Sequence, residues 1–169
     1  VHSINYILYF LMNFKISVSI FLLSSLIYTN NIEIITTNDL HGNIAPQKAW
    51  FMNPGFPPDI VGGAGLIKYI EQSRNISDSE ILVFDAGNFF QGHPYGMVDG
   101  GSNIIAWMNR AGYTALVPGA NDFVLGQENL NKLADSANFP FLMTNLICSD
   151  CELKSDNIKP YIIPTPEII

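Results

Sequence analysis

Residues 32–42 read Ile32-Glu33-Ile34-Ile35-Thr36-Thr37-Asn38-Asp39-Leu40-His41-Gly42 and decide the fold. The first six residues form a short run that is rich in β-branched side chains, and this pattern predicts a strand. Asp39 and His41 follow this strand two residues apart, and Gly42 lets the backbone turn sharply after them. Ligands of open α/β sheets bind beyond the carboxyl ends of the strands. We therefore expect ligand-binding or catalytic residues at the exit of this strand, the point where it ends.

The chain beyond this strand alternates between strand-like and helix-like patterns. Further strands are predicted over residues 81–84, 114–117 and 139–143. Helices are predicted over residues 65–74, from Ser102 to a stop at Gly112, and over residues 130–137. The continuous apolar run at 81–84 is typical of a strand that is buried on both faces. Repeated alternation of this kind predicts an α/β fold with mostly parallel strands and covering helices.

Polar side chains stand at the exits of the other predicted strands. The second strand runs into residues 85–88, the third into residues 118–122 and the fourth into Thr144-Asn145. The carboxyl ends of parallel strands meet at one edge of a sheet, so we expect these exits to converge. Carboxylate and imidazole groups suit a divalent metal. Converging exits could hold two ions about 3.5–4 Å apart, the arrangement that serves phosphate-ester hydrolysis.

The motifs resemble those of the calcineurin-like metallophosphoesterases, in particular the 5′-nucleotidase and 2′,3′-cyclic phosphodiesterase branch. Residues 36–42 resemble the first metal motif of that branch, residues 82–92 the second and residues 112–126 the third. The resemblance implies a partial calcineurin-like phosphoesterase sandwich, two divalent metal ions as cofactors (Mn²⁺, Zn²⁺, Mg²⁺ or Ca²⁺), and a nucleotide or other small phosphoester as substrate. The implied activity is phosphoester hydrolysis in nucleotide catabolism.

The resemblance also assigns roles to individual residues. Asp39 and His41 are implied as metal ligands. Asn88 stands where the family has the Asp that bridges both metals, and Asn121 stands where the third motif has a His that assists at the phosphate. An amide carries no charge, so replacing the bridging carboxylate weakens the attraction for two dications. We therefore expect a weakened site.

The family resemblance also calls for later histidines, including a His-x-His pair, which complete the second metal site. The three histidines of the chain all precede the third motif, and the last of them is His93. Residues 32–169 are therefore expected to be the N-terminal portion of a metallophosphoesterase domain, truncated either naturally or in the gene model.

Three functional hypotheses follow. The first is a metal-dependent nucleotide hydrolase that its substitutions impair. The second is a non-catalytic relative that binds a metal or a nucleotide without turnover. The third is a dinucleotide-binding domain, suggested by Gly63-Ala64-Gly65 before a helix with Asp85 some 20 residues on. A Pro-rich loop precedes these glycines and the third Gly of the fingerprint is absent, so the third hypothesis is disfavoured.

Residues 1–31 are expected to be a signal peptide or N-terminal anchor. Residues 12–15 contain a basic residue, and an apolar run of about a dozen residues follows to Tyr28. That run is shorter than the about 20 residues of a membrane span, and no other span is expected. Val1–Leu11 are a possible upstream read-through before a true start at Met12. The segment predicts a secreted, periplasmic or cell-surface protein.

Charge and cysteine content narrow the remaining alternatives. The formal net charge of −7 argues against nucleic-acid binding, which needs Lys and Arg to neutralise phosphates. The same net charge is compatible with a small phosphoester substrate whose negative charge is neutralised by bound metal ions. Cys148 and Cys151 form a lone C-x-x-C without the second ligand pair of a structural zinc site. A short-loop disulfide or two free thiols are expected in its place.

Overall fold

The computed structural model describes residues 12–15, 31–77, 79–147 and 152–164. The chain divides into two compact units, residues 1–31 and residues 32–169, and each is considered by itself. In the first unit, Met12–Lys15 are helical. Among the described residues, no helix combines the length and apolar character needed to cross a membrane. Cys148, Cys151 and most of the predicted targeting segment lie outside the described residues.

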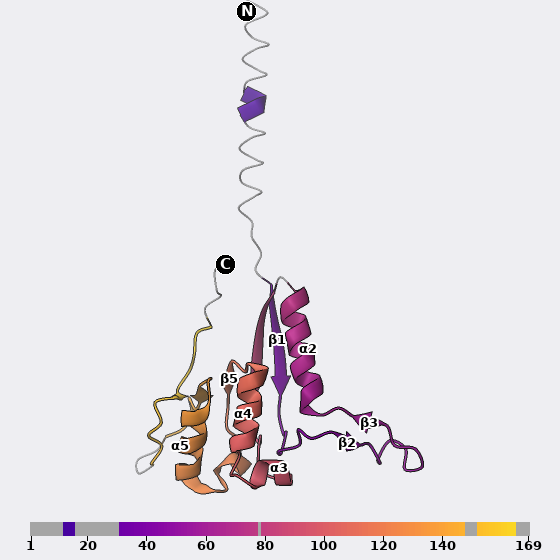
Figure 1. The fold of residues 1–169 in the computed structure, drawn as a ribbon. Coiled ribbons are helices and arrows are strands. Elements are labelled where there is room, and N and C mark those ends of the chain that lie inside the picture. Colours follow the sequence, from indigo (N-terminus) through magenta and orange to yellow (C-terminus); the bar gives the residue numbers. More distant parts are fainter. Residues whose placement is uncertain (1–11, 16–30, 78, 148–151, 165–169) are drawn as a thin grey trace, which may run out of the picture. The chain divides into compact units, whose positions relative to one another are not determined.

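The second unit is an α/β structure built on one parallel sheet (Figure 1). Its elements in chain order are β1 (Ile32–Thr37), β2 (Gln47–Lys48), β3 (Asp59–Ile60), α2 (Gly63–Ile76), β4 (Glu80–Asp85), α3 (Pro94–Met97), α4 (Ser102–Ala111), β5 (Ala115–Leu116), a 3₁₀ turn (Ala120–Phe123), α5 (Gly126–Ser136), β6 (Phe141–Leu142) and β7 (Ile158–Lys159). The main sheet has the order β1-β4-β5-β6-β7, and each neighbouring pair is parallel. The predicted α/β class with mostly parallel strands is therefore confirmed.

The register of the two longest strands places their exits level with each other. In β1 and β4, Ile32 pairs with Glu80 at one end and Thr37 pairs with Asp85 at the other. The residues that follow Thr37 and Asp85 therefore leave the sheet side by side. This register is what brings the first and second predicted motifs together.

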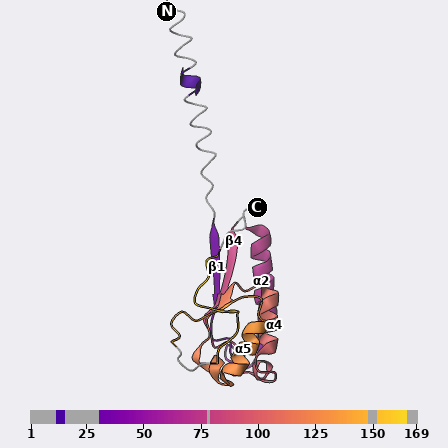
Figure 2. The same cartoon turned by 90° about the vertical axis from the view of Figure 1, so that its left-hand side faces the viewer.

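The helices α2 and α4 lie on the same side of β1 and β4 (Figure 2). Ile81 and Val83 of β4 are buried in the core, whereas Leu82 and Phe84 are only half-buried. The prediction that this strand is buried on both faces is therefore wrong for the described residues. The helix predicted to begin at Ser102 and stop at Gly112 is confirmed, and Gly112 ends it in the left-handed conformation at φ 72°.

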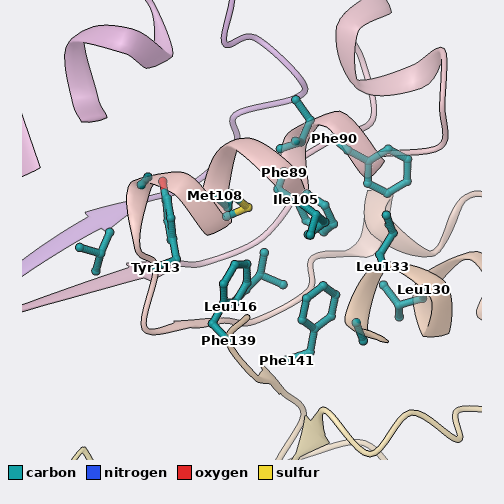
Figure 3. Close-up of a cluster of buried hydrophobic side chains, with 14 of the residues drawn as sticks. Phe89, Phe90, Ile105, Met108, Tyr113, Leu116, Leu130, Leu133, Phe139 and Phe141 are labelled. Carbon is teal, nitrogen blue, oxygen red and sulfur yellow. The ribbon is translucent and has the colours of Figure 1, made fainter. Parts of the chain in front are cut away.

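The core lies between the helices and the sheet, and it anchors the second exit loop (Figure 3). Phe89 and Phe90 follow Asn88 directly and are fully buried. Their ring centroids lie 5.1 Å apart, and Phe89 meets the ring of Phe141 edge-on at 6.1 Å. Burying an aromatic side chain contributes about 1.5–3 kcal/mol, so these two rings hold the loop in place. The remaining buried members of the core are Ile70, Ile81, Val83, Ile104, Ile105, Met108, Ala111, Tyr113, Leu116, Leu130, Leu133, Ala134 and Phe139.

Candidate metal centre

The exits of β1 and β4 are tied together through their backbones. The N–H of Asp39 donates to the carbonyl of Gly87 at 2.9 Å, and the N–H of His41 donates to the carbonyl of Asn88 at 2.9 Å. Gly42 continues the series by donating to the carbonyl of Phe89 at 2.8 Å. The ladder between the strands therefore extends past their ends. It places the two predicted metal motifs against each other.

The backbone at this junction adopts a conformation that side chains rarely accept. Asp39, His41 and Asn88 have φ values of 51°, 47° and 56°, and they are the only non-glycine residues with positive φ in the part of the chain that the structure describes. Residues with side chains avoid the left-handed region, and exceptions cluster at functional sites where surrounding contacts hold them. All three are residues that the motifs assign to the metals. The backbone and the motifs therefore single out the same place.

The imidazole of His41 is oriented by the loop that follows Asn88. Its Nδ1 lies 2.7 Å from the carbonyl oxygen of Gln91, which can only accept a hydrogen bond. In the neutral imidazole Nδ1 therefore carries the proton, and Nε2 has the free lone pair. The Nε2 atom lies 3.7 Å from Oδ1 of Asp39. A hydrogen bond that fixes the tautomer in this way is the usual support of a metal-binding histidine.

The Asp39 carboxylate is half-exposed and held by two amides. Asn88 Nδ2 donates to Oδ1 at 2.8 Å, and Asn38 Nδ2 donates to Oδ2 at 3.0 Å. The hydrogen bond from Asn88, with a smaller contribution from that of Asn38, lowers the pKa of Asp39 below its ordinary value. The carboxylate is therefore ionised at neutral pH, as a metal ligand must be.

The amide of Asn88 points its donor toward Asp39. Its Oδ1 accepts from the backbone N–H of Asn121 at 3.1 Å, on the other side of the amide. A carboxylate needs a donor and an N–H needs an acceptor, so both neighbours require this one orientation. The predicted residues Asp39, His41 and Asn88 are thus brought together. Asn121 joins them through its backbone.

Asp39 and His41 are spaced as two ligands of one divalent ion would be, and the amide of Asn88 is not turned to bridge a second ion. Two ligands of one ion at about 2.1 Å stand about 3–3.6 Å apart, close to the separation of His41 Nε2 and Asp39 Oδ1. Asn88 would have to turn its amide over to offer oxygen, and would then lose its hydrogen bonds to both Asp39 and Asn121. Among the described residues, no group of three His, Cys, Asp or Glu side chains is placed to hold an ion.

Asp122 fastens the second and third exits to each other. Its Oδ2 accepts from the backbone N–H groups of Asn88 at 2.7 Å and Gly119 at 2.8 Å, and its Oδ1 accepts from that of Phe89 at 2.9 Å. The side chain is fully buried, and this burial raises the pKa of its carboxyl. The sequence placed Asp122 in the third motif but did not indicate that it turns inward. Three backbone donors on one carboxylate fix the loop that carries Asn88.

A second buried carboxylate lies beneath the junction. Asp85 accepts from the hydroxyl of Thr37 at 2.6 Å and from the N–H of Gly87 at 2.8 Å. The Thr37 hydroxyl also lies 2.8 Å from that of Tyr113. Burial raises the pKa of Asp85 to about 6, against the opposing effect of these hydrogen bonds. The sequence predicted a polar group at this strand exit but did not indicate that Asp85 supports the junction through hydrogen bonds from Thr37 and Gly87.

The fourth exit has a different hydrogen-bond partner in the described residues. The Thr144 hydroxyl donates to the carbonyl of Pro160. Among the hydrogen bonds found for the described residues, none joins Thr144 or Asn145 to the exits of β1, β4 or β5. Among the described residues, hydrogen bonds therefore join three of the four predicted exits, and the convergence of the fourth stays a prediction.

Comparison with known proteins agrees with this architecture. No protein-family model matches the chain. The 5′-nucleotidase of Bos taurus is 31% identical over 115 residues, which are 67% of this chain and 20% of that protein. NAD nucleotidase from Haemophilus influenzae superimposes with a TM-score of 0.68 and 26% identity over 80% of this chain and 24% of its own. A 5′-nucleotidase precursor from Thermus thermophilus supports the fold, with a TM-score of 0.69 and 24% identity over 78% of this chain and 25% of its own.

The parallel sheet and the polar cluster at its exits define the α/β class of the calcineurin-like phosphoesterases. The chain spans about a fifth of the length of the curated relatives it matches. Within that class it is a partial 5′-nucleotidase-like metallophosphoesterase, which confirms the resemblance drawn from its motifs.

Proposed function

We propose that the chain carries part of a metal-dependent phosphoester hydrolase that acts on nucleotides. The observation that carries the proposal is the meeting of Asp39 and His41, each held at positive φ, at the exits of β1 and β4. Relatives named 5′-nucleotidase and NAD nucleotidase support a nucleotide as the substrate class. A site whose backbone is strained and whose side chains reach solvent is more consistent with ligand binding than with stability alone.

In this proposal Asp39 and His41 hold one divalent ion. When bound, the ion would supply Lewis-acid stabilisation of phosphate oxygens and lower the pKa of a bound water. The Gln91 carbonyl keeps the Nδ1 proton on His41, so that Nε2 stays a lone-pair donor. Asn38 and Asn88 orient the Asp39 carboxylate through their amides. Asn121 would stand at the phosphate, and its amide cannot transfer a proton as an imidazole can.

A second candidate function is favoured by one specific observation. Asn88 Nδ2 already donates to Asp39 Oδ1, at the place where a bridging carboxylate would face an ion. This hydrogen bond partly satisfies the negative charge of Asp39 without a metal. A non-catalytic relative, which binds a metal or a nucleotide without turnover, would keep the fold and lose the rate enhancement.

Phosphate release from AMP in the presence of Mn²⁺ tests these two functions. We expect weak release or none from the wild-type chain, because Asn88 and Asn121 replace a charged and a protonatable group. Weak release that Asp39→Asn abolishes supports the impaired hydrolase, and release that Asp39→Asn leaves unchanged would remove the claim of catalysis. Robust release abolished by Asp39→Asn would overturn the impaired site. Glu71→Gln, an exposed change on α2, is the matched control.

We also propose that residues 1–31 direct export, as a signal peptide or an N-terminal anchor, and that residues 32–169 are a portion of the metallophosphoesterase domain. The basic residue Lys15 and the apolar run that follows it to Tyr28 support this proposal. Expression in a secreting host, followed by N-terminal sequencing of the recovered protein, tests it. Recovery of the unprocessed chain from the cytosol alone would contradict it.

A further inference from the structure

The hairpin formed by β2 and β3 projects away from the main sheet (Figure 1). Gln47 pairs with Ile60 and Lys48 pairs with Asp59 in an antiparallel register. Nζ of Lys48 lies 2.6 Å from Oδ1 of Asp59, so the two charges at the base of the hairpin neutralise each other. The tip between them, residues 49–58, contains no charged residue.

The tip displays large apolar side chains to solvent. Trp50, Phe51, Met52 and Phe56 are 61%, 81%, 66% and 83% exposed. Scattered single apolar residues are normal on a protein surface, but these four lie within seven positions of one hairpin tip. Such a patch marks a surface that binds something apolar.

The backbone of the tip holds this display in place. Asn53 Oδ1 accepts from the N–H groups of both Gly55 and Phe56 at 3.1 Å. The N–H of Ala49 donates to the carbonyl of Pro58 at 2.9 Å and closes the loop. Pro54, Pro57 and Pro58 further restrict the backbone through their fixed φ. The apolar side chains are therefore presented by an ordered turn, which lowers the entropy cost of binding.

We propose that this tip, residues 49–58, inserts into the interfacial region of a zwitterionic lipid bilayer. Trp and other aromatic residues favour that region because their rings are apolar and the indole N–H can remain hydrated. No charge within the tip has to be desolvated, and the Lys48–Asp59 pair at its base can stay among the headgroups. The projecting shape suits a soft bilayer better than a protein partner, whose binding hot spots are anchors packed into pockets.

The charge of the chain selects the type of lipid. A net charge of −7 opposes approach to anionic headgroups, so zwitterionic phosphatidylcholine is the surface that the tip fits. This inference is independent of the metal site. If the tip does not bind vesicles, the proposed hydrolase function is unaffected. If the chain does not hydrolyse phosphoesters, the proposed membrane insertion of the tip is unaffected.

Fluorescence of Trp50 on phosphatidylcholine vesicles tests the inference. The full chain is used with Trp107→Phe, so that Trp50 is the remaining tryptophan, and the wild-type chain is measured in parallel. We expect a shift of the emission maximum to shorter wavelength and quenching by brominated lipid. A local probe is needed because the apolar residues 1–31 can themselves bring the chain to a vesicle.

Matched variants show whether the tip is responsible. Phe51→Ser with Phe56→Ser should abolish both the shift and the quenching, whereas Ile76→Ser with Val98→Ser removes equally exposed apolar residues elsewhere and should retain them. Unchanged Trp50 emission on vesicles would overturn the inference. A shift that grows with protein concentration in the absence of lipid would also overturn it, in favour of a second copy of the chain.

Discussion

Removing the buried carboxylate of Asp122 should destabilise the fold more than removing any exposed one. In Asp122→Ala, the backbone N–H groups of Asn88, Phe89 and Gly119 lose their acceptor. Each buried donor left unsatisfied costs about 1–3 kcal/mol. Asn88 is only partly buried, so water can reach its N–H group in the variant and replace part of the lost hydrogen bonding. The summed cost of the three donors is therefore taken near its lower end. The expected loss is about 3–5 kcal/mol in the free energy of unfolding.

The isosteric change Asp122→Asn separates the hydrogen bonds from packing. The amide keeps the shape of the side chain but turns an NH₂ group toward one set of backbone donors. The expected loss is about 2–3 kcal/mol, smaller than for Ala because one oxygen keeps its partners. Both variants should unfold at lower urea concentration with an unchanged slope.

Urea unfolding followed by circular dichroism measures both changes. Glu71→Ala removes an exposed carboxylate on α2 and should stay within about 0.5 kcal/mol of the wild type, as surface changes usually do. If the unfolding free energy of Asp122→Ala also stays within about 0.5 kcal/mol of the wild type, the conclusion that Asp122 fixes the loop carrying Asn88 is refuted. The loop that carries Asn88 would then be held by its phenylalanine anchors alone.

Three further changes test the supports of the site and the core. The raised pKa of Asp85, about 6, means that the folded chain binds more protons than the unfolded chain between about pH 4 and 6. Stability should therefore fall as the pH rises through that window, and Asp85→Asn should flatten the fall in urea titrations. Gly87→Ala places a Cβ at φ 100° onto the backbone of Gly119 and should cost about 2–4 kcal/mol by the same assay, whereas no measurable loss would show that the exits can separate. Leu133→Ala empties a buried position of α5 and should cost about 2–5 kcal/mol, and a loss under about 1 kcal/mol would contradict its place in the core.

The α/β class and the meeting of the first two exits could be predicted from sequence because they depend on local patterns. The β-branched run of β1 and the apolar run of β4 are each readable alone, and parallel pairing then aligns Thr37 with Asp85. The resemblance pointed to Asp39 and His41 as ligands, and the geometry is compatible with that role. Their assignment as metal ligands stays a prediction.

Other features depend on partners far along the chain and could not be predicted. The direction of the Asn88 amide is set by Asp39 and Asn121, which lie 49 and 33 residues away. The inward turn of Asp122 depends on the approach of the loop that begins at Asn88. The strands β2 and β3 have two residues each within a Pro-rich segment, which is too short for any pattern to show.

The most direct test of the account is a calorimetric titration with Mn²⁺. The central claim is that Asp39 and His41 form one weak divalent-ion site. His41→Ala should weaken Mn²⁺ binding at least about 10-fold, as loss of a ligand should exceed that of a supporting contact. His93→Ala removes an imidazole that stacks on Tyr95 and keeps the backbone N–H that donates to the His41 carbonyl, so it should leave the dissociation constant unchanged. Equal dissociation constants for wild type and His41→Ala would contradict the account.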